Sequence, residues 1–160
     1  MATAEILLRY AGGGSVPATW AQENFGPCLK FDDTTPEAAH FGGVVPDNYA
    51  SDPVLTVYYS MASANTTDKL DLEASVMAVT PDDAADIDTL SFDTANAANE
   101  VVPDTAGYMS ELDIALANAD SMAAGDLLLI KVERDADDAT DDTATGDAEV
   151  RAVVLRYTTS

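Results

Sequence analysis

The sequence predicts an all-β fold, a single antiparallel β-sandwich of about eight strands with a jelly-roll-like arrangement. Apolar and polar residues alternate with a period of two along much of the chain, which is typical of strands with one buried face. Clusters of Asp, Thr, Gly and Pro separate these segments, as turns require. Asp provides 21 of the 29 acidic residues and Lys plus Arg number only 7, so the chain lacks the strong helix formers of a helical bundle. An immunoglobulin-like sandwich and a barrel are the alternatives.

The expected strands follow one another along the chain, and turn signals separate them. They cover residues 3–10, 28–32, 38–45, 53–61, 69–79, 107–118, 126–134 and 148–157. The first is followed by Gly12-Gly13-Gly14, which we interpret as a flexible turn, and the third stops at Pro46. The fourth is the clearest strand, because β-branched and aromatic residues fill it.

The fifth and sixth segments predict which side chains form the core. Their alternating apolar residues are Leu70, Leu72, Ala74, Val76 and Ala78 in the fifth, and Leu112, Ile114 and Leu116 in the sixth. Asp71, Glu73 and Ser75 occupy the other side of the fifth segment, where a strand would expose them to water.

Three further segments have weaker patterns. Residues 84–99 contain either another strand at 88–92 or one or two helical turns. Residues 119–124 are expected to form a single helical turn capped by Asp120 or Ser121. Residues 135–147 carry six acids and no apolar residue beyond Ala, which predicts an acidic, solvated surface loop between the last two strands.

Length and charge restrict the classes of function. The 160 residues, 47% of them hydrophobic, suit one domain spanning residues 1–160 with a core of ordinary size. The formal net charge of -22 excludes a nucleic-acid binder of the usual cationic kind and argues against an anionic membrane surface. No stretch approaches the roughly 18 apolar residues of a membrane span. We therefore expect neither nucleic acid nor a membrane as a partner.

Few residues are available for catalysis or for soft metals. The only His is His40 and the only Cys is Cys28, so a nucleophile–His–acid arrangement lacks support and a zinc site lacks ligands. His40 is expected to be a partly buried structural residue beside Phe41, and Cys28 a small buried residue. The sequence therefore predicts a protein that is not an enzyme and has no cofactor.

Calcium is the one metal that the composition leaves open. Asp135, Asp137 and Asp141 have the spacing of the start of an EF-hand loop, whose oxygen ligands suit a hard cation. Gly is missing at the sixth position of that pattern, and Gly146 stands where the twelfth position needs Glu. A plain solvated loop is therefore the favoured interpretation.

Four aromatic residues are candidates for stacking on a sugar: Trp20, Tyr49, Tyr58 and Tyr59. At least one of the adjacent pair Tyr58 and Tyr59 must face outward if Leu55 and Val57 face the core. An aromatic core of the sandwich is the alternative that the sequence favours.

The second half of the chain resembles a known family. The resembling residues are Pro53–Tyr59, Leu72–Pro81, Ala123–Asp138 and Gly146–Tyr157. Over roughly 50–158 they are similar to small β-sandwich virion structural proteins of tailed, often marine, bacteriophages. The resemblance implies a non-enzymatic protein of the virion, most simply a capsid decoration or cement protein on the outer head surface. A receptor- or glycan-binding module of a tail fibre or head fibre is the alternative.

The resemblance also suggests partners and an assembly. The partner would be the major capsid protein or another virion protein, and the oligomer a trimer. Residues 1–50 match the family less well and are a candidate assembly segment. Within it, Trp20, Phe25 and Phe31 lie among Gly and Pro and are predicted to form subunit contacts, with a private core position as the alternative for Trp20.

Overall fold

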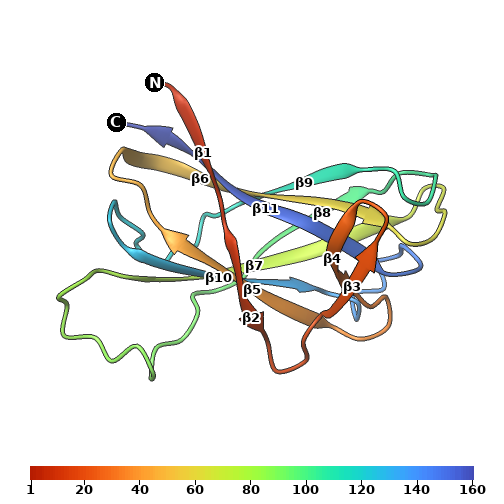
Figure 1. The fold of residues 1–160 in the computed structure, drawn as a ribbon, viewed down its shortest axis with the longest axis horizontal. Coiled ribbons are helices and arrows are strands. Elements are labelled where there is room, and N and C mark those ends of the chain that lie inside the picture. Colours follow the sequence, from red (N-terminus) through yellow and green to blue (C-terminus); the bar gives the residue numbers. More distant parts are fainter.

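The computed structural model describes residues 1–160 and contains strands without helices, arranged as two sheets packed face to face (Figure 1). The strands are β1 (Thr3–Leu7), β2 (Arg9–Gly13), β3 (Thr19–Glu23), β4 (Gly26–Phe31), β5 (Glu37–Val44), β6 (Tyr49–Met61), β7 (Lys69–Val79), β8 (Asn96–Val101), β9 (Ser110–Ala115), β10 (Leu127–Arg134) and β11 (Ala148–Thr159). No helix has the length and apolarity that crossing a membrane requires. The predicted all-β sandwich is confirmed, with more strands than the eight expected.

Each sheet combines strands from distant parts of the chain. The first, sheet A, runs β3-β4-β11-β6-β9, and β1 pairs with the second half of β11. The second, sheet B, runs β2-β5-β10-β7-β8. The pairs along both sheets are antiparallel. The chain changes sheet at Leu8, which is buried between β1 and β2.

The space between the sheets holds one core cluster of 29 buried residues. Sheet B contributes Leu70, Leu72, Ala74 and Val76 from β7, and sheet A contributes Leu112 and Ile114 from β9. These are positions that the period-two pattern predicts, and Ala78 packs against the cluster while partly buried. Most of the fold's stability comes from this burial, since apolar area removed from water contributes about 25 cal/mol per Å².

The N-terminal segment differs from its prediction. Residues 3–10 form parts of two strands in different sheets, β1 and β2. Gly12 and Gly13, which the sequence assigns to a turn, lie in β2, an edge strand of sheet B. Gly12 has φ +138° at a register shift in β2, and a Cβ on Gly13 would collide with Pro17. The glycines are therefore needed for a bulge and a close approach of backbone, which is more than a flexible turn requires.

Two strands that the sequence does not predict, β3 and β8, lie at the edges of their sheets. β3 and β8 are largely exposed or half-buried, so their residues show little alternation of apolar and polar character. Residues 88–92 form no strand, and β8 begins only at Asn96. The turn at 119–124 is not helical, because Asp120 and Ser121 have φ of 50° and 56°, which is the left-handed region.

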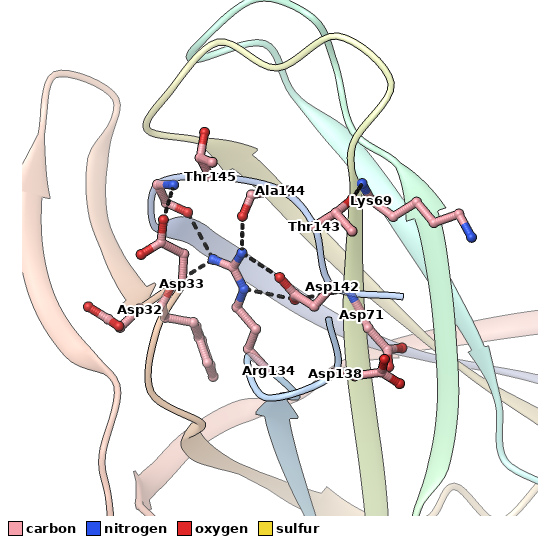
Figure 2. Close-up of polar contacts among 12 residues, drawn as sticks. Asp32, Asp33, Lys69, Asp71, Arg134, Asp138, Asp142, Thr143, Ala144 and Thr145 are labelled. Carbon is pink, nitrogen blue, oxygen red and sulfur yellow. Dashed lines mark hydrogen bonds and ion pairs between the residues drawn. The ribbon is translucent and has the colours of Figure 1, made fainter. Parts of the chain in front are cut away.

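The acidic loop 135–147 connects β10 to β11 and is only partly solvated (Figure 2). Asp142 and Ala144 are buried, and the amides of Thr143 and Ala144 both donate to the carbonyl of Lys69 at 2.9 and 2.8 Å. The loop thus packs against the start of β7. Asp71, predicted to face water, is 5% exposed for this reason.

Candidate functional site

A hollow opens on the outward face of sheet A, with a volume of about 400 Å³. Its lining residues are Phe25, Tyr58, Gly107, Met109, Arg151 and Ala152. Phe25 lies in the β3–β4 turn and is 87% exposed, and Met109 is 52% exposed. The hollow therefore combines exposed apolar side chains with a guanidinium group.

Local structure explains how these side chains reach the same face. Val57 and Tyr59 of β6 are fully buried, so the intervening Tyr58 projects outward by the alternation of a strand. Arg151 lies at a register shift of β11, between Val150 and Ala152. Such a bulge redirects one side chain relative to the regular pattern. Tyr58 follows from the sequence pattern, whereas nothing in the sequence marks a bulge at Arg151.

Arg151 has hydrogen-bonding capacity that the chain does not use. Its Nη2 donates to the Glu149 carboxylate at 3.1 Å, and its guanidinium carbon lies 5.8 Å from the centre of the Phe25 ring. Its Nη1 is buried without a hydrogen-bond partner. A donor left unpaired in a folded protein costs free energy, so a small movement of Arg151 or Phe25 that let Nη1 meet a ligand oxygen would recover that cost.

A polar network continues from the hollow along the same face. The Tyr58 hydroxyl accepts a hydrogen bond from Nη2 of Arg156 at 2.8 Å, and Arg156 also pairs with Glu111 at 3.2 Å and Asp113 at 3.5 Å. A hydrogen bond to Glu111 is the main cause that raises the pKa of Tyr58 above its usual value. The network holds the phenol ring at the wall of the hollow and surrounds it with donors and acceptors.

Three of the aromatic residues singled out in the sequence are partly or fully packed within the fold, away from this hollow. Tyr59 is fully buried and donates its hydroxyl to Glu100 at 2.7 Å. Tyr49 is half-buried and packs on Tyr157, with ring centres 5.7 Å apart. Phe31 is fully buried in the core, which corrects its prediction as a subunit contact. It lies two residues after Leu29 in β4, so both side chains point to the same face, toward sheet B.

Trp20 belongs to a second aromatic surface, separate from the hollow. Trp20 is 51% exposed, and its ring stands edge-on to that of Tyr10, with the ring centres 5.1 Å apart. Tyr10 in turn lies 6.2 Å from Phe41. These rings bridge β3 of sheet A and β2 of sheet B at the edge of the sandwich. Trp20 and Phe25 remain accessible to a partner subunit.

Sheet B carries an apolar groove of about 540 Å³ on its outward face. Val44, Ile87 and Leu127 line it and are each more than half exposed. Arg9 is the one charged residue of the lining. This groove offers few hydrogen-bonding side chains and differs in chemistry from the hollow on sheet A.

The residues considered for catalysis or metal binding are not gathered into a common site. Cys28 is 1% exposed, and His40 is half-buried with its ring 5.3 Å from that of Phe92, as the sequence predicts. Asp137 is exposed and Asp141 pairs with Lys69 at 3.2 Å. The EF-hand-like set Asp135, Asp137 and Asp141 therefore does not converge on one point.

No family model matches this chain, and no curated protein matches it. Several solved structures are similar in fold. They include the exo-β-1,3-galactanase from Phanerochaete chrysosporium with galactose (TM-score 0.54, 7% identity, 98% of this chain and 30% of that one) and the family 35 carbohydrate-binding module (CBM35) from Cellvibrio japonicus (0.51, 9%, 98% and 99%). A third is the C-terminal CBM6 of a marine laminarinase from Zobellia galactanivorans (0.47, 10%, 98% and 100%).

These likenesses concern architecture. This chain spans less than a third of the galactanase but nearly the whole of the CBM35. At such low identity, what is shared is the jelly-roll β-sandwich fold, and the predicted jelly-roll-like arrangement is thereby confirmed.

Proposed function

We propose that this protein is a non-catalytic module that binds neutral glycans, the alternative that the sequence left open. The hollow between Phe25 and Tyr58 carries the proposal, because it joins an exposed aromatic ring to an unused guanidinium donor. The jelly-roll fold shared with the CBM35 from Cellvibrio japonicus supports it.

The chemistry of a sugar suits this surface. A pyranose has an apolar C–H face that packs on an aromatic ring, and its hydroxyl groups both donate and accept hydrogen bonds. Phe25 and Tyr58 supply rings, while Arg151 supplies donors and Glu111 lies beside Tyr58 as an acceptor. The volume of about 400 Å³ falls within the range of about 300–1,000 Å³ for small-ligand sites.

The charge of the protein narrows the ligand class. With a formal net charge of -22, the protein repels polyanions at long range. Sulfated or uronic-acid-rich polysaccharides are therefore poorer ligands than neutral glucans, galactans, xylans or mannans.

A panel of soluble neutral polysaccharides, run by affinity electrophoresis on the purified chain, tests this function. Retardation by at least one neutral glycan is expected, and Phe25→Ala and Tyr58→Ala are each expected to weaken it at least tenfold. Trp20→Ala is the matched control, because it removes an exposed aromatic ring outside the hollow. Loss of binding with Trp20→Ala alone would move the site to the sandwich edge, and no retardation by any glycan would reject the function.

The apolar groove on sheet B favours a second candidate, capsid decoration. Exposed Val44 and Leu127 at its rim suit a protein partner more than a sugar, since apolar patches of this kind mark interaction sites. Binding to the major capsid protein, a trimeric assembly and a place on the virion surface remain proposals that follow from the sequence resemblance. Co-sedimentation of the chain with purified phage heads, with copies per particle measured by gel densitometry, tests them. A decoration protein requires hundreds of copies.

A further inference from the structure

Three aspartates converge where the acidic loop 135–147 meets β7. Asp71 lies near the start of β7, Asp135 directly follows β10, and Asp138 lies in the loop. One carboxylate oxygen from each lies within 4.8 Å of the others. Figure 2 shows the carboxylates of Asp71 and Asp138 next to one another.

Asp71 is a buried acid without a partner. The residue is 5% exposed, and its buried Oδ1 has no hydrogen-bond partner. None of the ion pairs in the structure includes Asp71, Asp135 or Asp138. An unpaired carboxylate is costly to bury, and native structures leave few such groups unsatisfied. The chain therefore provides no cation to neutralise this cluster of three carboxylates.

The other acidic cluster of the molecule makes a useful contrast. Glu23, Cys28 and Glu149 also come within 4.8 Å of one another. Lys30 supplies the cation there, because its Nζ lies 2.9 Å from Glu23 and 3.4 Å from Glu149. Near Asp71, both basic residues are engaged elsewhere, Lys69 with Asp141 and Arg134 with Asp142.

We propose that Asp71, Asp135 and Asp138 bind one Ca²⁺ ion, which fastens loop 135–147 to β7. All three ligands are carboxylates, which select a hard cation. Two oxygens bound to the same Ca²⁺ at about 2.3–2.6 Å lie no more than about 5 Å apart, and the cluster meets this limit as it stands. Mg²⁺ demands a near-octahedral geometry and gives up its bound waters reluctantly, so a set of three protein carboxylates suits Ca²⁺ better.

The surrounding structure holds the ligands in place. Oδ1 of Asp138 accepts hydrogen bonds from the amides of Thr140 at 2.8 Å and Asp141 at 3.2 Å, and these bonds lower the pKa of Asp138. The amide of Asp135 donates to the carbonyl of Asp71 at 3.3 Å, which fixes these two residues side by side. In the absence of a cation, burial and the neighbouring acids, Asp135 first among them, raise the pKa of Asp71 to about 6.

Thermal unfolding of the full chain, stripped with EDTA and titrated with CaCl₂ at constant ionic strength, tests the site. A ligand that binds only the folded state stabilises it by RT ln(1 + [L]/Kd), so above Kd the Tm should rise steadily with the logarithm of the Ca²⁺ concentration, and it should rise less with Mg²⁺. Calorimetric titration should give one ion per chain. Asp71→Asn and Asp138→Asn should abolish the Ca²⁺-dependent rise.

Asp137→Asn is the matched control, because it removes the same charge from an exposed neighbour outside the cluster, and it should keep the full response to Ca²⁺. Asp71→Asn should also melt higher than the wild type in EDTA, since it removes a buried unpaired charge, which shows that the variant is folded. The proposal is overturned if Ca²⁺ gives neither a rise in Tm nor a saturable calorimetric signal, or if Asp137→Asn loses as much of the rise as Asp71→Asn. If both variants lost the rise in Tm equally, Ca²⁺ would be acting by general screening of the protein's negative charges and not by binding at one site.

Discussion

Arg134 and Asp142 form a two-pronged ion pair inside the protein, with Nε 2.9 Å from Oδ2 and Nη2 2.8 Å from Oδ1. The remaining N–H groups of the guanidinium donate to the carbonyls of Phe31, Ala144 and Gly146. All five donors of a side chain that is fully buried are thus satisfied (Figure 2). This arrangement explains how an arginine is tolerated in the interior, and it fastens the loop 135–147 to the sandwich.

Replacing Arg134 should destabilise the protein more than any other charge change. Arg134→Met leaves Asp142 buried without its partner, which costs about 3–5 kcal/mol in such pairs. Urea unfolding followed by circular dichroism measures the loss. The control is Lys131→Met on the same strand, whose partner Glu133 is 29% exposed, and an exposed pair of this kind contributes at most about 1 kcal/mol. Equal effects of the two variants would contradict the structural role of Arg134.

A second prediction concerns Gly146, which is part of the same network. It has φ +81°, and a Cβ placed on it would collide with Ser63. Gly146→Ala should therefore lower the free energy of unfolding through both backbone strain and this collision. Gly125→Ala is the control, because Gly125 has φ +88° but open space around its Cα, so only the strain of about 1–2 kcal/mol applies.

The double variant Gly146→Ala/Ser63→Gly separates the two causes for Gly146. Its free energy of unfolding, measured by chemical denaturation, should exceed that of Gly146→Ala. The gain should equal the amount by which Gly146→Ala costs more than Gly125→Ala. If Gly146→Ala and Gly125→Ala cost the same, the contact with Ser63 has no energetic weight.

The strands that bury a face were predictable, and the exposed ones were not. Leu70 and Leu72 alternate with acids because one side of β7 faces the core, and this pattern is visible without a structure. β3 contributes little to the core and has one neighbouring strand, so its residues are not constrained to alternate. Leu8 marks the crossing between sheets, yet within 3–10 it looks like one more apolar residue.

The candidate sites depend on contacts that a local pattern does not contain. The outward direction of Tyr58 follows from its place between Val57 and Tyr59, whereas its proximity to Phe25 depends on the order of strands in sheet A. Asp71 and Asp138 are far apart in the sequence and meet only because β7 pairs with β10. Inspection of 135–147 alone therefore groups Asp135 with Asp137 and Asp141, whereas the structure brings Asp135 together with Asp71 and Asp138.

The exposure of Trp20 predicts how its removal affects stability. Trp20 is already half exposed to water, so Trp20→Ala should cost the isolated chain far less than Phe31→Ala, for which about 3–5 kcal/mol is expected in a fully buried position. If Trp20 packs against another subunit, its truncation should also shift the sedimentation coefficient while the far-UV spectrum stays that of a β protein. A melting loss as large as that of Phe31→Ala, with unchanged sedimentation, would show that Trp20 acts as a private core residue.

The last prediction concerns the pH dependence of stability at His40. Burial, and to a smaller degree the positive charge of Lys131, lowers the pKa of His40 below its usual value. The unfolded chain therefore binds a proton at higher pH than the folded protein does, and His40 opposes folding as the pH falls through about 6.5 and below. Above that pH both states hold a neutral imidazole, and the residue contributes no pH dependence.

His40→Gln should remove this component while keeping a polar side chain beside Phe92 and Lys131. The measurement is the free energy of unfolding of both proteins in urea at pH 7.5 and pH 5.0. Other acids titrate in both proteins alike, so the difference between the two pH effects isolates His40. The wild type should lose more stability, or gain less, than His40→Gln on going to pH 5.0. An identical change in the two proteins would mean that the folded structure protonates His40 as readily as the unfolded chain does, and that its packing against Phe92 excludes too little water to matter.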